Sequence, residues 1–443
     1  MKKNFIYSLF SLCLANVSYA VTLQEAVTYA QNNPTVKAAQ SSAKSYAKLY
    51  DASKAKAYYP SLDLSYNGLY LKDKPTVDFH LPIAIPGLGG AFQMQPQNQY
   101  SGALTLSYPL FSGFAIESQM NITQLEARKA KLKTLDIKRN LYLGIVQVYA
   151  AALSLKQLKN SQNVAFNASK KSYKKAQAFY KLGMIAPAEL YRIASSLHSI
   201  EAQLISTKNQ YKTALRELSF LSHHPINNIS KLPNTTSFNF DILQKQALEK
   251  RPDLKMLRML VKEQANKIKL AKSQYYPNVA IFARAAYTGD TPRLNGDGYT
   301  NKNKSALGFM LNYNIFNGFE TKNEVQAAQE AKLASEFMLA SYKEQISSQI
   351  YQDYLTFSSY KEQLTAAQSE VKAAESYEKL IQGEFENQIS DADTLSRAIS
   401  ASALARAKLI NTKAQMYFSY AKILLEVDNN TFLNTLNKDE QND

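Results

Sequence analysis

Few side chains in this 443-residue sequence could carry chemistry. Its histidines form no metal-ligand spacing with cysteines or acids, and they stand at His80, His198, His223 and His224. The adjacent pair His223–His224 lies at an expected helix end, where surface or capping roles are common. No GxxxxGK(S/T) segment is present to hold ATP phosphates. We therefore expect no enzymatic activity, no cofactor and no metal centre.

The remaining candidates lie in two turns between long helical patterns. In KLGMIAPAEL, Gly183 suits the end of one helix and Pro187 the first position of the next, with Glu189 close behind. In ENQISDADTL, Asp391 and Asp393 stand at the N-terminus of the last long helix. They either cap that helix and complement its dipole, or form an acidic constriction that attracts cations.

The elements that must position these turns occur twice. Three segment pairs recur in the same order: QNNPTVK and EKRPDLK, YYPSLDL and YYPNVAI, LSYPLFSGF and LNYNIFNGF. Such internal similarity indicates two copies of one structural unit. We place the copies at residues 21–238 and 239–430, followed by a short acidic C-terminal tail at 431–443.

Each copy is expected to contain a helix, two strands, a long helix and a second helix. In the first copy we expect a helix at 22–57, strands at about 61–71 and 100–110, and helices at about 115–183 and 187–221. In the second copy we expect a helix at 241–274, strands at about 278–288 and 305–316, and helices at about 320–388 and 391–427. Apolar and small residues in the last helix of each copy recur at alternating spacings of three and four, which is typical of a coiled coil.

The four strand segments alternate with period two. One face is apolar, with Tyr near its ends, and the other is small or polar, as in Leu104, Leu106 and Tyr108 against Thr105 and Ser107. About ten tilted residues cross a bilayer, so the pattern favours an outer-membrane β-barrel. The alternative is a soluble antiparallel sheet that packs one face on a core. The flanking helices offer no obvious cover, because their apolar seams are committed to each other.

Four strands are too few to close a spanning barrel. Two chains would give eight strands with a filled interior, and three would give twelve with a lumen. Small and polar inward faces favour the trimer. Gly113 and Gly318 would provide backbone freedom where strand becomes helix, and Pro60 and Pro277 would stop the helices on the reverse passage.

The N-terminal segment 1–20 is expected to be a signal peptide that is cleaved after Ala20. It holds the only cysteine, Cys13, so the mature chain would have no disulfide. No later stretch approaches the roughly 18 apolar residues of a spanning helix. The formal net charge of +16 suits anionic lipid neighbours, and we expect no nucleic-acid partner because no binding signature is present.

In its duplicated strand–helix passages and two further motifs, the sequence resembles the TolC family of outer-membrane efflux channels. Besides the duplicated strand–helix passages, the matching motifs are RPDL at Arg251–Leu254 and YKLGMIAPAEL at Tyr180–Leu190. The resemblance covers nearly the whole mature chain. It implies an α+β membrane protein and a homotrimer, with a twelve-stranded outer-membrane barrel continuous with an α-helical coiled-coil tunnel in the periplasm. It also implies two partners, a periplasmic adaptor (membrane fusion protein) and an inner-membrane pump that supplies the energy.

Coiled-coil ends would meet at the two turns, where small changes in helix crossing would close or open the tunnel. We therefore take these turns as the candidate periplasmic gate, with the residues Gly183, Pro187, Glu189, Asp391, Asp393, Thr394 and Arg397. The two family positions that can carry gate aspartates fall on Thr394 and Arg397, so the acidic ring is displaced or absent. The function implied is an exit duct for drugs, detergents or bile-like compounds. Alternatives are a type I protein secretion outlet, a periplasmic coiled-coil scaffold or adaptor, and a metal-ion exporter, which the lack of a Met or His ladder disfavours.

Overall fold

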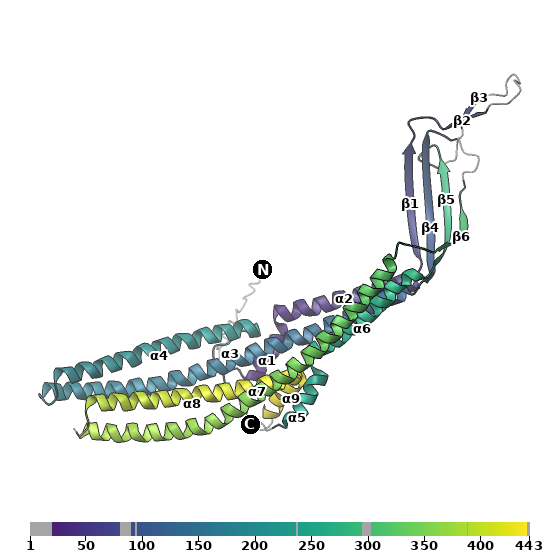
Figure 1. Ribbon diagram of the computed structural model, residues 1–443. Coiled ribbons are helices and arrows are strands. Elements are labelled where there is room, and N and C mark those ends of the chain that lie inside the picture. Colours follow the sequence, from purple (N-terminus) through teal and green to yellow (C-terminus); the bar gives the residue numbers. More distant parts are fainter. Residues whose placement is uncertain are drawn as a thin grey trace, which may run out of the picture. The chain divides into compact units, whose positions relative to one another are not determined.

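The structure is a computed structural model that describes residues 20–79, 90–93, 95–235, 238–294, 303–387 and 389–440 (Figure 1). Cys13, His80 and most of the expected signal peptide lie outside these ranges. So do residues 80–89 and 94 of the loop 72–99, which connects the first two expected strands. The chain divides into two compact units. The first comprises Met1–Gln40, Leu132–Lys255 and Tyr342–Asp443, and the second comprises Ser41–Lys131 and Met256–Ser341.

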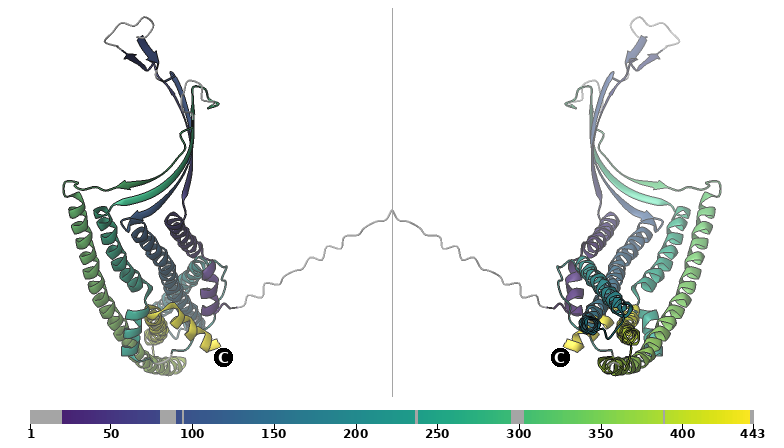
Figure 2. Two further views of the ribbon diagram at one scale, coloured as in Figure 1. Left: turned by 90° about the vertical axis from the view of Figure 1, so that its right-hand side faces the viewer. Right: turned by 90° about the vertical axis from the view of Figure 1, so that its left-hand side faces the viewer.

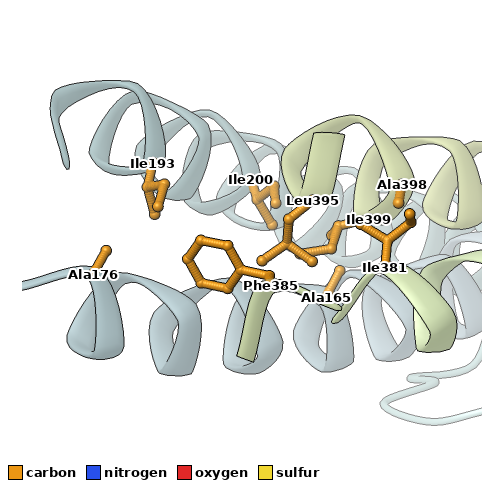
Figure 3. Packing of buried hydrophobic residues seen from close by; sticks show 9 residues of the cluster. All are labelled: Ala165, Ala176, Ile193, Ile200, Ile381, Phe385, Leu395, Ala398 and Ile399. Atoms are coloured by element: carbon orange, nitrogen blue, oxygen red, sulfur yellow. The ribbon is translucent and has the colours of Figure 1, made fainter. Parts of the chain in front are cut away.

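The first unit is helical. It holds α1 (Leu23–Tyr29), η1 (Ala30–Asn32), α4 (Pro187–Ser222), α5 (Phe240–Lys250), α8 (Ala392–Val427), α9 (Asn429–Glu440), and parts of α3 (Ala115–Lys181) and α7 (Glu320–Glu386). The coiled-coil seam is buried, as at Ile193, Leu197 and Ile200 in α4. A cluster near the turns joins four helices, and Figure 3 shows its side chains gathered between them: Ala165, Ala176, Ile193, Ile200, Ile381, Phe385, Leu395, Ala398 and Ile399.

Both expected first helices are interrupted by a proline. The first is divided into α1, η1 and α2 (Pro34–Tyr58), and the second into α5, α6 (Pro252–Lys272) and η2 (Ser273–Tyr275). Proline has no N–H and forces the residue before it out of the helical region. Accordingly Asn33 has ψ 134° and Arg251 has ψ 129°. The expectation of one continuous helix in each place is wrong for this reason.

The C-terminal segment differs from the expected tail. Residues Asn429–Glu440 form α9, which buries Phe432 and Leu436. The helix packs against α1 and α8. Phe432 and Leu436 lie about one helical turn apart and form an apolar face. The prediction of a tail at 431–443 did not take this face into account.

The second unit carries the sheet. Strands β1 (Ser61–Tyr70), β4 (Asn98–Ser112), β5 (Asn278–Gly289) and β6 (Ala306–Asn312) pair antiparallel in the order β1-β4-β5-β6. Figure 2 shows them as one curved sheet. A separate hairpin of β2 (Thr76–Phe79) and β3 (Gly90–Gln93), which we did not expect, occupies part of the loop 72–99.

One helix of the described chain passes a test for membrane span by length and composition. An 18-residue window of α3 reaches a mean hydropathy of 1.3, and 44% of that window is buried inside the structure. The expectation that no later segment approaches such a span is therefore wrong on this measure. Ile145, Val146 and Tyr149 of this helix are buried inside the first unit, as in the core helix of a helical domain.

Candidate functional site

The strand register gathers the apolar residues of four separate segments on one face. Leu62 pairs with Leu106, which pairs with Ala283, which pairs in turn with Leu307. This face is uncovered, with Leu64 81% and Leu307 84% exposed. A sheet with its apolar face on its own core would bury these side chains, so the exposure argues against the soluble-sheet alternative.

The opposite face is small and polar, with the exception of Phe282, which pairs with Ser107. One row across it runs from Asp63 through Thr105 to Arg284, and the next from Ser61 through Ser107 to Phe282. In the described part of the chain, the outer edges of β1 and β6 have no strand partner. An apolar face that ends in two open edges is the pattern of a barrel segment, because lipid tolerates the face but not the unpaired edges.

The two strand–helix passages use left-handed backbone, as expected for glycine. Gly113 has φ +60° and Gly318 has φ +65°, and each is followed by a Phe that is also left-handed. Pro60 lies between the end of α2 and β1, and Pro277 between η2 and β5. The structure therefore places all four predicted residues at the passages, and their role there stays a prediction.

The first of the two candidate turns ends α3 and begins α4. Gly183 has φ +68°, and the N–H of Met184 donates to the carbonyl of Phe179 at 2.9 Å. Pro187 occupies the first turn of α4, where its missing N–H costs nothing. Glu189 lies in the same turn, where its charge complements the helix dipole.

In the second turn, Asp391 and Asp393 differ in their surroundings. Asp391 is the N-cap of α8, and its Oδ1 accepts from the N–H of Thr394 at 2.7 Å. This hydrogen bond, with the positive charges of Arg397 and Arg192, holds the pKa of Asp391 below its ordinary value. Asp393 instead forms ion pairs with Arg397 at 2.9 Å and with Arg192 of α4 at 3.7 Å.

The capping role of Asp391 is therefore visible, and the acidic constriction stays a prediction. The structure brings Asp393, Thr394 and Arg397 together with Arg192, which sequence reasoning missed. The pair between Asp393 and Arg192 joins the first turn of α8 to the second turn of α4, and these helices are far apart in sequence. Gln388, in the same turn, lies outside the described residues.

A buried ionic network in the first unit was also missed. Arg251 forms ion pairs with Asp253 at 2.7 Å and with Glu426 near the end of α8, and Asp253 also pairs with Arg139 of α3 at 3.2 Å. Tyr342 of α7 donates to Asp253 at 2.9 Å. Burial opposes ionisation of Asp253, but the two arginines and the tyrosine hydroxyl hold its pKa far below the ordinary value.

The corresponding helix break in the first copy, before Pro34, is held by uncharged groups. Asn33 precedes Pro34 as Arg251 precedes Pro252, and the amide of Asn33 donates to the carbonyl of Leu221 at 2.9 Å. The recurring proline was the sequence signal for both helix breaks. Only the three-dimensional packing shows that one is ionic and the other uncharged.

The described residues contain no group of three or more His, Cys, Asp or Glu side chains placed to hold a metal ion. His198 contacts Glu201 at 3.1 Å, His224 stacks on Tyr29, and His223 ends α4 in a left-handed conformation. Ala20 immediately precedes Val21, whose N–H donates to the carbonyl of Asn228 at 3.0 Å. Cleavage after Ala20 stays a prediction.

The exposed apolar sheet and the long paired helices define an α+β outer-membrane channel class of protein. The chain matches the outer membrane efflux protein family over residues 27–222 and 243–424, and it belongs to that family. It is therefore an outer-membrane protein whose helical part lies in the periplasm, as the resemblance implied. A search among curated proteins found no match.

Solved structures share the fold at low sequence identity. The chain is 16% identical to the Campylobacter jejuni CmeC outer membrane channel, with a TM-score of 0.76 over 93% of this chain and 85% of that one. The outer membrane protein VceC from Vibrio cholerae gives 14% identity and 0.74 over 91% and 95%. The open state of the Neisseria gonorrhoeae MtrE outer membrane channel gives 14% and 0.72 over 91% and 88%. The expected fold class is thus confirmed.

Proposed function

We propose that three copies of this chain form a passive exit duct for small molecules such as drugs, detergents or bile-like compounds. Four strands from each of three chains give a twelve-stranded barrel, which leaves a lumen. The observation that carries the proposal is the exposed apolar face of a sheet with two open edges, since a single chain cannot seal it in lipid.

The long helices would continue the path into the periplasm as a tunnel of coiled coils. Each candidate turn ends a helical hairpin of the first unit, so the turns would form the periplasmic end, where a change in helix crossing opens or closes the path. A periplasmic adaptor and an inner-membrane pump would dock there and supply the energy, and catalysis by the chain itself is not part of the proposal.

Purified protein in a planar bilayer tests the duct. We expect stepwise conductance from a species whose mass in detergent is that of a trimer. An efflux assay in cells that lack the chain should show accumulation of a fluorescent dye, reversed by the intact gene. A monomer that stays in solution without detergent and gives no conductance would contradict the proposal and favour the scaffold alternative.

A further inference from the structure

The two copies of the repeat keep the same hairpin register. Ser61 pairs with Ser107 in the first hairpin, and Asn278 pairs with Asn312 in the second. Each residue of β1 therefore corresponds to the β5 residue 217 positions later, and each residue of β4 to the position 205 later around β6. This correspondence allows each contact between the two copies to be compared with its counterpart.

At the first strand–helix passage, a residue of the second repeat of the same chain completes a cluster of three aromatic rings. Phe111 and Phe114 pack edge to face with ring centroids 5.4 Å apart, and Tyr276 lies 6.4 Å and 5.7 Å from them. Gly113 is enclosed as well. A Cβ there would lie 2.9 Å from that of Tyr276 and would overlap the carbonyl oxygen of Ser273.

The second passage contains only two of the three rings. Phe316 and Phe319 pack edge to face at 5.5 Å, and within the described part of the chain no third ring packs against them. They are 71% and 63% exposed, and a Cβ on Gly318 would meet nothing within 4 Å. The residue that corresponds to Tyr276 is Tyr59, which is 70% exposed and precedes β1 at the far edge of the sheet.

The pairing of the strands also lacks a partner at the second passage. β4 continues to Ser112 because β5 pairs with its last residues, from Tyr108 to Ser112. β6 ends at Asn312, although its sequence continues in the same pattern to Asn317. This explains why β6 is shorter than the expected strand 305–316. Among the described residues, no strand pairs with the continuation 313–317 on the side that corresponds to the pairing of β5 with β4.

We infer that a second copy of this chain completes the passage, with Tyr59 of the partner subunit as the third ring beside Phe316 and Phe319. The same correspondence fixes the strand register between subunits, with Asn312 opposite Ser65 of the partner subunit, as Ser107 is opposite Phe282 within the chain. The inference rests on the proposed trimer, but it names contacts that a trimer alone does not require.

Cysteine pairs test the register. The only cysteine, Cys13, lies in the expected signal peptide, so introduced thiols would be alone in the mature chain. Asn312→Cys with Ser65→Cys should give a covalent trimer ladder on a non-reducing gel. Asn312→Cys with Ser61→Cys is the matched control, because four strand residues place those thiols on the same face roughly 13 Å away, too far for a disulfide. Ser107→Cys with Phe282→Cys reports reactivity within one chain.

The outcomes separate the register from the proposed function. A ladder from the first pair alone supports the inference. A trimer that cross-links through Ser61→Cys, or through neither pair while the internal pair reacts, overturns the register and leaves the channel standing. Protein that is monomeric in the membrane overturns both.

Tyr59 variants test the third ring. Tyr59→Ala should lower the temperature at which the trimer dissociates in SDS, and Tyr59→Phe should not, because the ring rather than the hydroxyl fills the site. Tyr58→Ala is the control, since Tyr58 is also exposed, at 63%, and its counterpart Tyr275 is outside the cluster of three aromatic rings. Equal dissociation temperatures for Tyr59→Ala and Tyr58→Ala would overturn this part of the inference.

Discussion

Arg251 donates from Nε and Nη2 to the two carboxylate oxygens of Asp253, at 3.1 Å and 2.7 Å, across the proline that separates α5 from α6. Both residues are buried. Two parallel hydrogen bonds of this kind fix the geometry as well as the charge. The pair therefore holds the backbone at the helix break, and its links to Arg139 and Glu426 extend that constraint to α3 and α8.

Removing the carboxylate of Asp253 should destabilise the protein, because it lies between two buried arginines. Asp253→Ala removes the carboxylate that Arg251 and Arg139 share, while Arg251 keeps Glu426 and Arg139 keeps Asp136 at 2.8 Å. We therefore expect a loss of about 3 kcal/mol in the free energy of unfolding, the lower end of the cost of breaking a buried ion pair. Denaturant unfolding in detergent, followed by helical circular dichroism, measures it. Asp51→Ala is the control, because Asp51 pairs with Lys48 and Lys54 only at the surface, and it should leave the curve unchanged. Similar curves for the two variants would contradict the assignment.

Two buried carboxyl groups predict that the free energy of unfolding depends on pH. One is Asp253, and the other is Glu263 of α6, which pairs with Lys129 and, at 2.9 Å, with Lys267. Burial opposes ionisation of both carboxyl groups, but hydrogen bonds and the charges of their cationic neighbours outweigh it and lower both pKa values below the ordinary 3.8 and 4.5. A carboxyl with a lowered folded pKa contributes stability above its unfolded pKa, and that stability is lost as pH falls through the folded value. Unfolding free energy should thus be flat near neutrality and decline below about pH 4. Glu263→Gln should make the decline shallower, and an identical slope would exclude its contribution.

Much of the sheet could be predicted from sequence because strand faces follow from local alternation. Leu104 and Leu106 share a face whatever their partners are. The end of β6 could not be predicted in this way, because a strand ends where its pairing ends and that depends on another strand. The helix breaks were available locally in Pro34 and Pro252, and the long apolar pattern around them hid the signal.

In the candidate turns, too, local features could be predicted from the sequence and contacts between distant segments could not. Asp391 as an N-cap is a local matter of residue type and position, so it was among the readings of the sequence. The pairing of Asp393 with Arg192 joins two helices far apart in the chain. No spacing rule within one helix finds such a contact. The buried network around Arg251 was missed for the same reason.

Charge on the apolar face should prevent insertion. Leu106→Arg and Phe309→Arg place a guanidinium on the exposed apolar face, so each should cost roughly 2–4 kcal/mol near the bilayer midplane. Ser107→Arg is the matched control, since its side chain lies on the polar face of the same strand. Heat-modifiable migration of the trimer from outer-membrane fractions measures assembly. Normal assembly of both apolar-face variants would contradict the assignment of that face to lipid.

Crowding at Gly113 should add to backbone strain. Gly113→Ala must adopt φ +60° and displace Ser273 and Tyr276, whereas Gly183→Ala at φ +68° meets only open space. The shared strain is about 1–2 kcal/mol, so the unfolding free energy should fall further for Gly113→Ala. Denaturant titration of the two variants measures the difference. Equal losses would mean that the neighbouring backbone yields to the added methyl group.

Asp391 can be tested for charge separately from capping. Asn caps a helix about as well as Asp, so Asp391→Asn keeps the bond to Thr394 but removes the charge. Asp391→Ala removes both, and should cost the start of α8 about 1 kcal/mol. If the turn lies at a constriction, Asp391→Asn combined with Asp393→Asn should lower the preference for cations in planar-bilayer reversal potentials, since each charge would be repeated three times around the lumen. Arg397→Gln should shift the potential the opposite way by freeing Asp393. Unchanged potentials in both would leave Asp391 as a helix cap alone.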